Sequence, residues 1–260
     1  MSTGKRERST MSGFAQRWVL PFFDPRAVMR LAALPRYVTE MNAFRRMAKT
    51  GWPVAWRDTH PCLSERTATT PFDPHYFYQS AWLARRLVEM RPAAHVDIGS
   101  SVMMINAISA IVPVTFVDIR PLVCDLSDLK SIAGSIVALP FADASQTSIS
   151  CLHVIEHIGL GRYGDRVDPE GYGRALAELA RVAAPGGRLY ISTPVGRQRV
   201  CFNAHRVFDP ATIIAGLPGL SLTRFSLVDD SGRFQENCTL SKVEGLDYGC
   251  GLFEFQRRAP

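Results

Sequence analysis

Two histidines flank a glutamate in the segment His153-Val-Ile-Glu156-His157, and His205 follows later in the segment FNAHRVF. Imidazole groups that meet in one cleft provide a general base near neutral pH, and a neighbouring carboxylate can orient a ring or share its proton. We therefore take His157, His205 and Glu156 as candidate catalytic residues. A structural role is the alternative interpretation for His153.

The spacing of His153 and His157 also occurs in metal sites, where both residues lie on one helix beside an acidic ligand. Here the pair spans the end of an apolar strand and the start of a loop, and the six cysteines show no paired metal-ligand spacing. We expect no metal ion. Cys124 and Cys151 lie in or beside apolar segments and are expected to be small core residues, and the cysteine usage indicates a reduced, cytosolic protein.

A glycine and an acidic residue mark the ends of two consecutive apolar segments. Gly99 follows VDI, and Asp118 ends VTFVD. Such a glycine lets the backbone approach a ligand at a helix N-terminus, and an acid at the end of the next strand can accept hydrogen bonds from a ribose diol. Asp97, before the glycine, could bind an ammonium group of the same ligand.

The segment Gly159-Leu-Gly161-Arg-Tyr-Gly164 has the spacing GxGxxG. A dinucleotide site requires these glycines directly after the first strand of the domain and at the start of a helix. Here acidic residues, a proline and another glycine follow, which favour an irregular chain. The segment therefore predicts a flexible active-site loop rather than a nicotinamide or flavin site.

The elements that must position these residues alternate between strand and helix. Apolar, β-branched segments predict strands, and the helical spacing of apolar residues predicts a helix that ends before Pro185-Gly186-Gly187. The expected strands are 93–98, 114–118, 135–138, 147–154, 188–192, 221–228 and 252–256, and the expected helices are 76–90, 102–111, 172–182 and 210–217.

This alternation is typical of an α/β protein with a doubly wound, mostly parallel seven-stranded sheet. The last two strands have no long helix between them, so we expect them to pair as an antiparallel end. Ligands bind such sheets at the carboxyl ends of the strands, where the candidate residues lie.

The positive charge of the chain is uneven. Residues 1–57 contain 11 Lys or Arg and 3 Asp or Glu, whereas residues 58–260 contain 19 and 21. The main domain is therefore nearly neutral, which argues against a groove for nucleic acid. The polar, basic start lacks the apolar core of a signal peptide, and no segment of about 20 apolar residues predicts a membrane span.

Three regions follow from these patterns. Residues 1–13 predict a disordered basic tail, residues 14–75 a helical and loop-rich appendage, and residues 76–260 the main domain. One helical face of the appendage combines Tyr37, Val38, Met41, Phe44 and Ala48. We expect the appendage to pack on the domain as a lid. The alternative is a basic amphipathic surface, within residues 1–57, for peripheral contact with an anionic membrane.

Four motifs resemble, in order and spacing, those of the class I S-adenosylmethionine-dependent methyltransferases: VDIGSS, VDIRP, LPFADASQTSISCLHVIEHI and LARVAAPGGRLYISTP. The resemblance covers residues 93–196 and is closest to the type 11 group. The segments HVIEHIGLGRYGD and FNAHRVF are similar to an uncharacterised, domain-of-unknown-function branch, some members of which accompany surface-polysaccharide genes. The first motif departs from the usual pattern, because Gly99 is its only glycine.

The resemblance implies a Rossmann-like fold with S-adenosylmethionine as cofactor, and it assigns roles to individual residues. Asp97, Gly99 and Ser100 would line the methionine end of the cofactor, Asp118 its ribose, and Ser135 and Ile136 its adenine, with Ile119 and His153 also at this site. His205 would lie over the acceptor.

The implied reaction transfers the methyl group to an oxygen, less readily a nitrogen, of a small-molecule or glycan acceptor. The alternative is a degenerate binding or assembly module for surface-polysaccharide synthesis that transfers no methyl group. We expect a cytoplasmic protein, with any membrane contact peripheral and at the inner face. No specific nucleic-acid partner is expected, and the sequence indicates no oligomeric state.

Overall fold

The structure is a computed structural model that describes residues 31–47 and 53–259. The chain divides into two compact units, Met1–Pro71 and Phe72–Pro260. The tail expected at residues 1–13 lies outside the described residues. Among the described residues, no helix is both long and apolar enough to cross a membrane.

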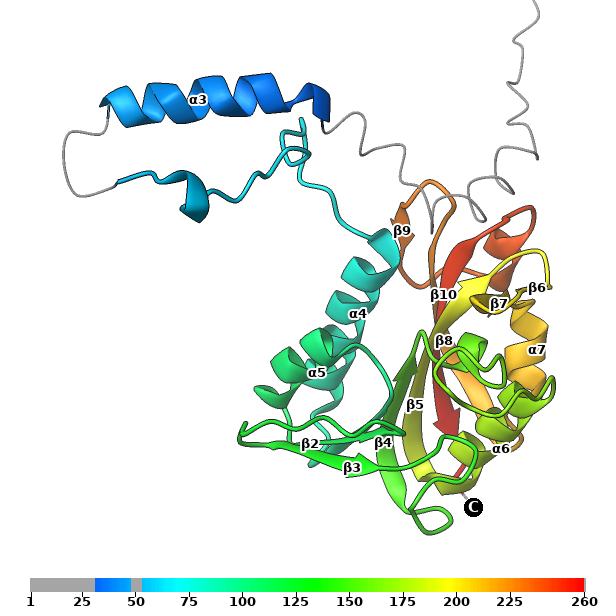
Figure 1. Cartoon of the computed structure of the whole chain (residues 1–260). Helices are drawn as coiled ribbons and strands as arrows, with labels where there is room; N and C mark the ends of the chain where they lie inside the picture. The colour runs from blue at the N-terminus through cyan, green and yellow to red at the C-terminus, as the bar shows by residue number, and fades with distance from the viewer. Residues whose placement is uncertain (1–30, 48–52, 260) are drawn as a thin grey trace, which may run out of the picture. The chain divides into compact units, whose positions relative to one another are not determined.

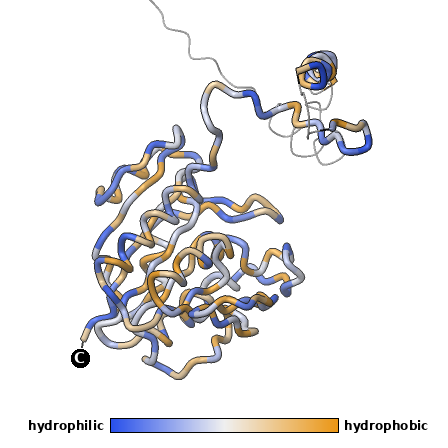
Figure 2. The backbone as a smooth tube through the Cα atoms, turned by 90° about the vertical axis from the view of Figure 1, so that its left-hand side faces the viewer, coloured by the Kyte–Doolittle hydropathy of each residue, from blue (hydrophilic) through white to orange (hydrophobic). Residues whose placement is uncertain are grey.

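The described part of the first unit contains one helix, α3 (Leu34–Met47), and a short 3-10 turn, η1 (Trp56–Asp58). The helix expected from the apolar face is thus confirmed, although Ala48 lies outside the described residues. The helix carries both hydrophobic and hydrophilic residues (Figure 2), and of its apolar side chains Met41 is buried while Phe44 is half exposed.

The second unit is built on a sheet of eight strands in the order β3-β2-β1-β4-β5-β10-β8-β9 (Figure 1). The strands are β1 (His95–Ile98), β2 (Val114–Asp118), β3 (Leu129–Ala133), β4 (Gln146–Leu152), β5 (Ala183–Val195), β8 (Leu220–Val228), β9 (Phe234–Gln235) and β10 (Gly249–Arg257). Strands β1 to β5 pair in parallel, whereas β10 is antiparallel to both β5 and β8. The expected fold class and antiparallel end are confirmed.

The sheet has one strand more than expected, because the two-residue β9 extends its edge. A separate hairpin of β6 (Arg199–Cys201) and β7 (His205–Val207) was also not anticipated from the sequence. Both are too short to show a period of alternating apolar residues, which is the signal that identifies strands in a sequence.

Helices cover both faces of the sheet and create two hydrophobic cores (Figure 1). On one face lie α4 (Pro74–Met90) and α5 (Val102–Ser109), which bury Trp82, Leu83 and Ile105. On the other lie α6 (Gly171–Val182) and α7 (Pro210–Ala215), which bury Leu176 and Ile213. Because both faces are covered, all four residues of β1 and the last five of β4 are buried, polar ones included.

Helix α4 begins two residues before the start expected from its apolar pattern. Asp73 caps it, because its carboxylate accepts hydrogen bonds from the backbone N–H groups of His75 and Tyr76, and Pro74 takes the first helical position. Proline is favoured there, since the first turn has no intrahelical acceptor for its N–H groups. The cap thereby fixes His75 and Tyr76 in the first turn.

The third strand was wrongly expected at Ser135–Ala138. The structure places it at Leu129–Ala133, where Asp118 of β2 pairs with Ala133. Residues 135–138 form a turn closed by a hydrogen bond from the Ala138 N–H to the Ser135 carbonyl. The real strand lies at the sheet edge and mixes polar with apolar residues, so its hydrophobic signal is weak. Because of this shift, Ser135 and Ile136 lie just after the carboxyl end of β3. Asp118 lies at the carboxyl end of the neighbouring β2.

The boundary between α6 and β5 also differs from the expectation. The helix ends at Val182 as expected, but β5 starts at Ala183 and runs through Pro185-Gly186-Gly187 instead of starting after them. The register against β4 shifts between Gln146 and Ser148, so the glycines form an irregularity within the strand rather than a separate turn. A side chain on Gly187 would meet the Ala184 carbonyl oxygen at 2.8 Å.

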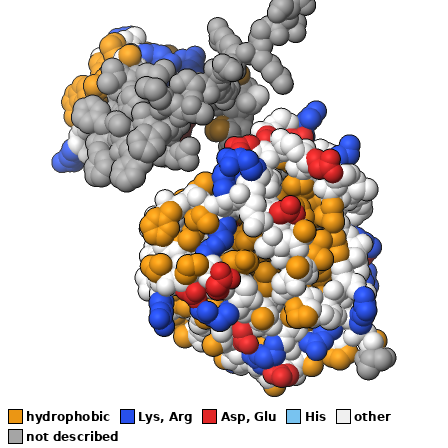
Figure 3. Space-filling view, turned by 90° about the vertical axis from the view of Figure 1, so that its right-hand side faces the viewer, with side chains coloured by type: hydrophobic (Ala, Val, Ile, Leu, Met, Phe, Trp, Pro, Cys, Tyr) orange, Lys and Arg blue, Asp and Glu red, His pale blue; other side chains and the backbone are white. Residues whose placement is uncertain are grey.

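The visible surface of the second unit in Figure 3 intersperses basic, acidic and hydrophobic side chains. No single sign of charge dominates this face. On this face, a site is therefore to be sought in a cavity rather than in an extended charged surface.

Candidate active site

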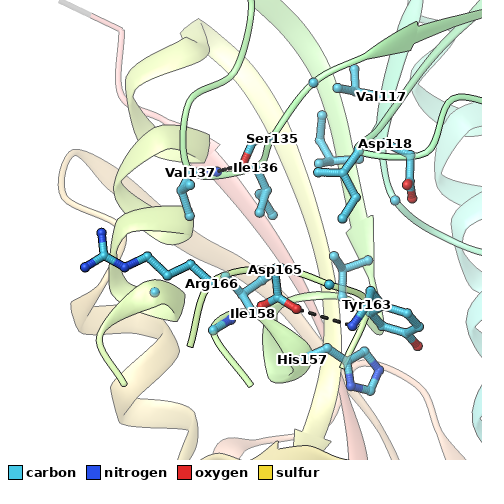
Figure 4. A pocket seen from close by; sticks show the side chains of 18 of the residues that line it. Val117, Asp118, Ser135, Ile136, Val137, His157, Ile158, Tyr163, Asp165 and Arg166 are labelled. Carbon is cyan, nitrogen blue, oxygen red and sulfur yellow. Dashed lines mark hydrogen bonds between the residues drawn. The ribbon is translucent and has the colours of Figure 1, made fainter. Parts of the chain in front are cut away.

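A cavity of about 490 Å³ lies at the carboxyl ends of β1, β2 and β4 (Figure 4). This volume is within the usual range for small-molecule sites. Its walls include six of the eight residues expected at a cofactor site, namely Gly99, Asp118, Ile119, Ser135, Ile136 and His153. These six residues come from four separate segments of the chain, and the fold brings them together at one cavity.

The turn after β1 requires glycine. Gly99 has φ +67°, a conformation that L side chains rarely adopt. A Cβ at this position would lie 3.3 Å from Cγ1 of Val154 and 3.6 Å from Oδ2 of Asp118. The glycine therefore keeps open the space in front of the Asp118 carboxylate.

Asp118 presents a carboxylate to this cavity. Its Oδ1 accepts a hydrogen bond of 2.7 Å from the backbone N–H of Arg120, which fixes the side-chain orientation. Its Oδ2 points toward Gly99. The side chain is 18% exposed, so a ligand can reach it without competing fully with bulk water.

Asp97 and Ser100 lie behind the cavity, and neither lines it, in contrast to the sequence expectation. The fully buried Asp97 accepts hydrogen bonds from the Ser100 N–H at 3.0 Å, from the Ser100 hydroxyl at 2.7 Å and from the Ser150 hydroxyl. Burial raises the pKa of Asp97 to about 6, although these hydrogen bonds act to lower it. Its oxygens are engaged within the protein, so we assign Asp97 to fastening the Gly99 turn onto β4.

A second cavity, of about 530 Å³, adjoins the first. Its lining includes the expected catalytic residues Glu156, His157 and His205, and also residues that sequence reasoning missed: His75, Tyr76, Arg162, Asp229, Asp230 and Tyr248. His153 and His157 line both cavities. These two histidines thus form the boundary between two candidate ligand sites.

The tautomer of neutral His157 follows from its hydrogen bond. Its Nδ1 lies 2.7 Å from the backbone carbonyl oxygen of Ala204, and because a carbonyl only accepts, Nδ1 carries the proton. The Nε2 lone pair is left free, 3.9 Å from Oε1 of Glu156. Burial lowers the pKa of His157, although Glu156 opposes this effect. The ring is thus neutral near pH 7 and can accept a proton at Nε2.

Glu156 and His153 form a buried pair. Nδ1 of His153 lies 2.6 Å from Oε1 of Glu156, and the Thr193 hydroxyl donates to Oε2 at 3.3 Å. Burial acts to raise the pKa of Glu156, but the facing imidazole outweighs it and the pKa falls below its ordinary value. A charged carboxylate at this position stabilises positive charge on the neighbouring imidazoles.

His205 lies at the start of β7, and its ring packs against Tyr248 with 5.1 Å between the ring centroids. Burial lowers its pKa, so this ring is also neutral near pH 7. His205 thus lines the second cavity beside His157, and its role as a base stays a prediction.

The loop 159–168 covers part of the first cavity (Figure 4). Asp165 ties it together by accepting hydrogen bonds from the N–H groups of Gly159 at 2.7 Å and Tyr163 at 3.3 Å. The guanidinium of Arg120 stacks on the Tyr163 ring at 4.7 Å. The three glycines of the GxGxxG segment have positive φ and open no helix, so the segment is irregular, as expected.

Asp229, at the end of β8, shapes the far side of the second cavity. Its carboxylate accepts hydrogen bonds from the N–H groups of Ser231 at 2.9 Å and Arg233 at 3.1 Å, and from Nε of Arg233 at 3.2 Å. Burial acts to raise the pKa of Asp229, but a hydrogen bond of 2.5 Å from the Ser231 hydroxyl, together with these bonds, lowers it to about 2.

We expect Asp229→Asn to lower the free energy of unfolding at pH 7 by about 1–2 kcal/mol. Because the folded-state pKa is depressed, this stabilisation is present above pH 4 and is lost as the pH falls from about 4 to 2. Denaturant titrations at several pH values should show the wild-type advantage disappearing in that window. An advantage that persists unchanged at pH 2 would contradict this assignment.

The missed residues carry only weak signals in the sequence. The Asp73-Pro74 helix cap could have placed His75 and Tyr76 at the first turn of α4. Tyr248 and Cys250 stand at the start of the last strand. Only the strand order, in which β5 separates β4 from β10, brings Cys250 within reach of His153 after β4. Nothing local in the sequence indicates that arrangement.

Comparison with known structures decides the fold. One similar structure is that of a protein from Galdieria sulphuraria described as a sarcosine dimethylglycine methyltransferase. It superposes with a TM-score of 0.51 at 13% identity, over 71% of this chain and 86% of the other. The N-methyltransferase NodS from Bradyrhizobium japonicum, in complex with S-adenosyl-L-homocysteine, gives a TM-score of 0.50 at 17% identity, over 83% and 97%. The chain has the class I methyltransferase fold.

The sequence comparisons identify a family of unknown function. Residues 127–232 match a family described as "Caenorhabditis protein of unknown function, DUF268". No curated protein matches the sequence. In this methyltransferase fold, the matched segment contributes β3, β4, β5 and both histidines that separate the two cavities.

Proposed function

We propose that this methyltransferase-fold chain is an enzyme that binds S-adenosylmethionine in the first cavity and transfers its methyl group to an acceptor in the second. The observation that carries the proposal is the shared boundary of the two cavities, which His153 and His157 line from both sides. Methyl transfer needs donor and acceptor side by side and shielded from water.

The residues of the first cavity fit this cofactor. The Asp118 carboxylate, one oxygen of which is held by the Arg120 N–H, suits a ribose diol, and the open space at Gly99 suits a close backbone approach. Ile136 and the Ser135 turn offer an apolar and a polar contact for the adenine. The cofactor, when bound, supplies a methyl group already activated by a positively charged sulfur.

The acceptor we propose is a hydroxyl, and a hydroxyl needs a base. His157 is neutral, its Nδ1 proton is fixed on Ala204, and its Nε2 lone pair is free. Glu156 lies 3.9 Å from Nε2 and would stabilise the imidazolium formed when His157 takes the acceptor proton. His205, in the same cavity, is the second candidate base.

The lining of the second cavity favours a small sugar or sugar-like acceptor over an apolar one. Tyr76, Tyr248 and the histidine rings provide flat faces for packing, while Asp230 and Arg162 provide polar groups for hydroxyls. The expectation of a role in polysaccharide synthesis rests on this chemistry together with the sequence resemblance. The expectation of peripheral membrane contact concerns residues 1–57, most of which lie outside the described part of the chain.

Isothermal titration with S-adenosylmethionine tests the proposal at its first step. We expect saturable binding of one cofactor molecule per chain, with S-adenosylhomocysteine competing for the same site. If no binding is detected at millimolar cofactor, the proposed function is wrong. If cofactor binds but no panel of hydroxyl or amine acceptors is methylated, the alternative of a binding module without methyl transfer is favoured.

A further inference from the structure

Three side chains with metal-binding atoms meet at the wall of the second cavity. They are His75 in the first turn of α4, His153 directly after β4, and Cys250 near the start of β10. One nitrogen of each imidazole and the Cys250 sulfur all lie within 4.8 Å of one another. These residues are far apart in the sequence, so the fold alone brings them together.

The separation of these atoms is close to that of a tetrahedral zinc site. Zinc binds imidazole nitrogen at about 2.0–2.1 Å and thiolate sulfur at about 2.3 Å, which at tetrahedral angles sets nitrogen and sulfur about 3.5 Å apart. Nε2 of His153 lies 3.4 Å from Sγ of Cys250. A nitrogen of His75 lies within 4.8 Å of both atoms, so the His75 ring moves closer to complete a three-ligand set.

The outer contacts of His153 are those of a metal ligand. Its Nδ1 faces the Glu156 carboxylate at 2.6 Å, and Glu156 is in turn held by Thr193. A carboxylate on the far nitrogen fixes the ring orientation and directs the Nε2 lone pair at the ion. His153 also has φ +54°, a backbone conformation uncommon for a residue with a side chain and concentrated at functional sites.

Aromatic packing holds the imidazoles in place. The His153 ring stacks with the rings of His75 and Tyr76, with 5.5 Å and 5.2 Å between ring centroids. The His75 ring also stacks with the Tyr248 ring, with 5.3 Å between centroids. His75 and His153 line the second cavity, whereas Cys250 is fully buried behind them. An ion held by all three would keep one position open toward the cavity.

We propose that His75, His153 and Cys250 bind a zinc ion whose fourth position opens into the second cavity. Two imidazoles and a thiolate favour zinc over magnesium or calcium, which prefer oxygen ligands. Three protein ligands with an open position are the arrangement of a zinc site that does chemistry rather than one that only stabilises the fold.

The open position suggests a role. A zinc ion there would bind the acceptor heteroatom as a Lewis acid and favour its deprotonation. That role rests on the proposed function, whereas the binding of the ion does not.

The same geometry has a competing interpretation. Cys250, His153 and Glu156 form a chain of contacts like that of a thiol nucleophile, its base and an orienting acid. A nucleophile must meet its substrate, however, and Cys250 is fully buried and does not line the cavity. Burial is compatible with a metal ligand, so the structure favours the ion.

Metal analysis of the full chain tests the proposal directly. We expect about one zinc ion per chain after purification in the absence of chelator, and stoichiometric uptake by chain stripped of metal. Cobalt(II) substituted for zinc should give the thiolate-to-cobalt charge-transfer absorption that reports a cysteine ligand. This signature needs no variant, so it stands even if a substitution impairs folding. A chain that takes up neither ion at micromolar concentration would overturn the proposal.

Variants then assign the ligands. We expect His75→Ala and Cys250→Ser each to weaken zinc binding by more than about 100-fold, and Glu156→Gln by about 10- to 100-fold. Matched controls are His205→Ala, which removes a histidine from the same cavity, and Cys151→Ala, which removes an equally buried cysteine. Both controls should keep full affinity. Loss of zinc in the His205 variant, or its retention in the Cys250 variant, would contradict the assignment.

The outcome is independent of methyl transfer. Zinc binding without cofactor binding would leave the metal site established and the proposed function wrong. Cofactor binding with no zinc would do the reverse. Bound cobalt also reports its ligands: a blue-shifted absorption spectrum that lacks the thiolate-to-cobalt charge-transfer band shows an ion held without Cys250. That result would overturn the proposed ligand set.

Discussion

Asp118→Ala is expected to weaken binding of S-adenosylmethionine by about 10- to 100-fold. A carboxylate that accepts two hydroxyl hydrogen bonds contributes about 1.5–3 kcal/mol when it is partly shielded from water. Asp118 meets that condition, because its side chain is 18% exposed and its Oδ1 is already oriented by the Arg120 N–H. Isothermal titration calorimetry of wild type and variant measures the effect.

Two further variants separate ligand binding from structural damage. Asp118→Asn keeps an oxygen acceptor for one hydroxyl and should lose less affinity than alanine does. Asp125→Ala removes an exposed carboxylate that does not line the first cavity, and its affinity should equal that of wild type. Equal affinity of Asp118→Ala and wild type would show that the carboxylate does not meet the cofactor.

His157→Ala should reduce the turnover of a hydroxyl acceptor by about 10²- to 10⁴-fold, the usual contribution of a general base. Cofactor affinity should change much less, because the proposed anchor for the ribose is the Asp118 carboxylate and not His157. Single-turnover methylation with radiolabelled cofactor measures the chemical step, and calorimetry measures the affinity.

The geometry of His157 offers a sharper control than alanine alone. Asparagine places its amide N–H where Nδ1 lies and can keep the hydrogen bond to the Ala204 carbonyl, whereas it has no base at the Nε2 position. Both variants should therefore be slow if His157 is the base. Recovery of turnover in His157→Asn would show instead that the residue only positions the Ala204 segment. His60→Ala, an exposed position in the first unit, should react at the wild-type rate.

The central part of the fold was predictable because it is buried on both faces. Strands β1, β2 and β4 each contain apolar and β-branched residues and are largely buried, and α6 shows helical spacing along one face. The edge strand β3 was misplaced because one side of an edge strand lacks a pairing partner and its residues are mixed. Local composition cannot identify such a strand until its neighbour β2 is in place.

The first cavity was largely predictable, since its residues follow directly from strand ends. The exceptions, Asp97 and Ser100, show why a strand end is an incomplete guide: their side chains turn inward to Ser150 and Leu152 instead of outward to a ligand. The second cavity was only partly predictable. His75 and Tyr248 reach it, and Cys250 lies behind it, through a helix cap and the pairing order of distant strands. No spacing in the sequence encodes their meeting.

The hairpin β6–β7 couples the choice of acceptor to the proton affinity of His157. It carries His205 in the wall of the second cavity, and between its strands it provides the Ala204 carbonyl that fixes the tautomer of His157. A substitution that remodels the hairpin to admit a new acceptor therefore also alters the basicity of His157. Divergence toward new substrates through this hairpin would then need compensating changes at His157 or Arg162, which also donates to the same carbonyl.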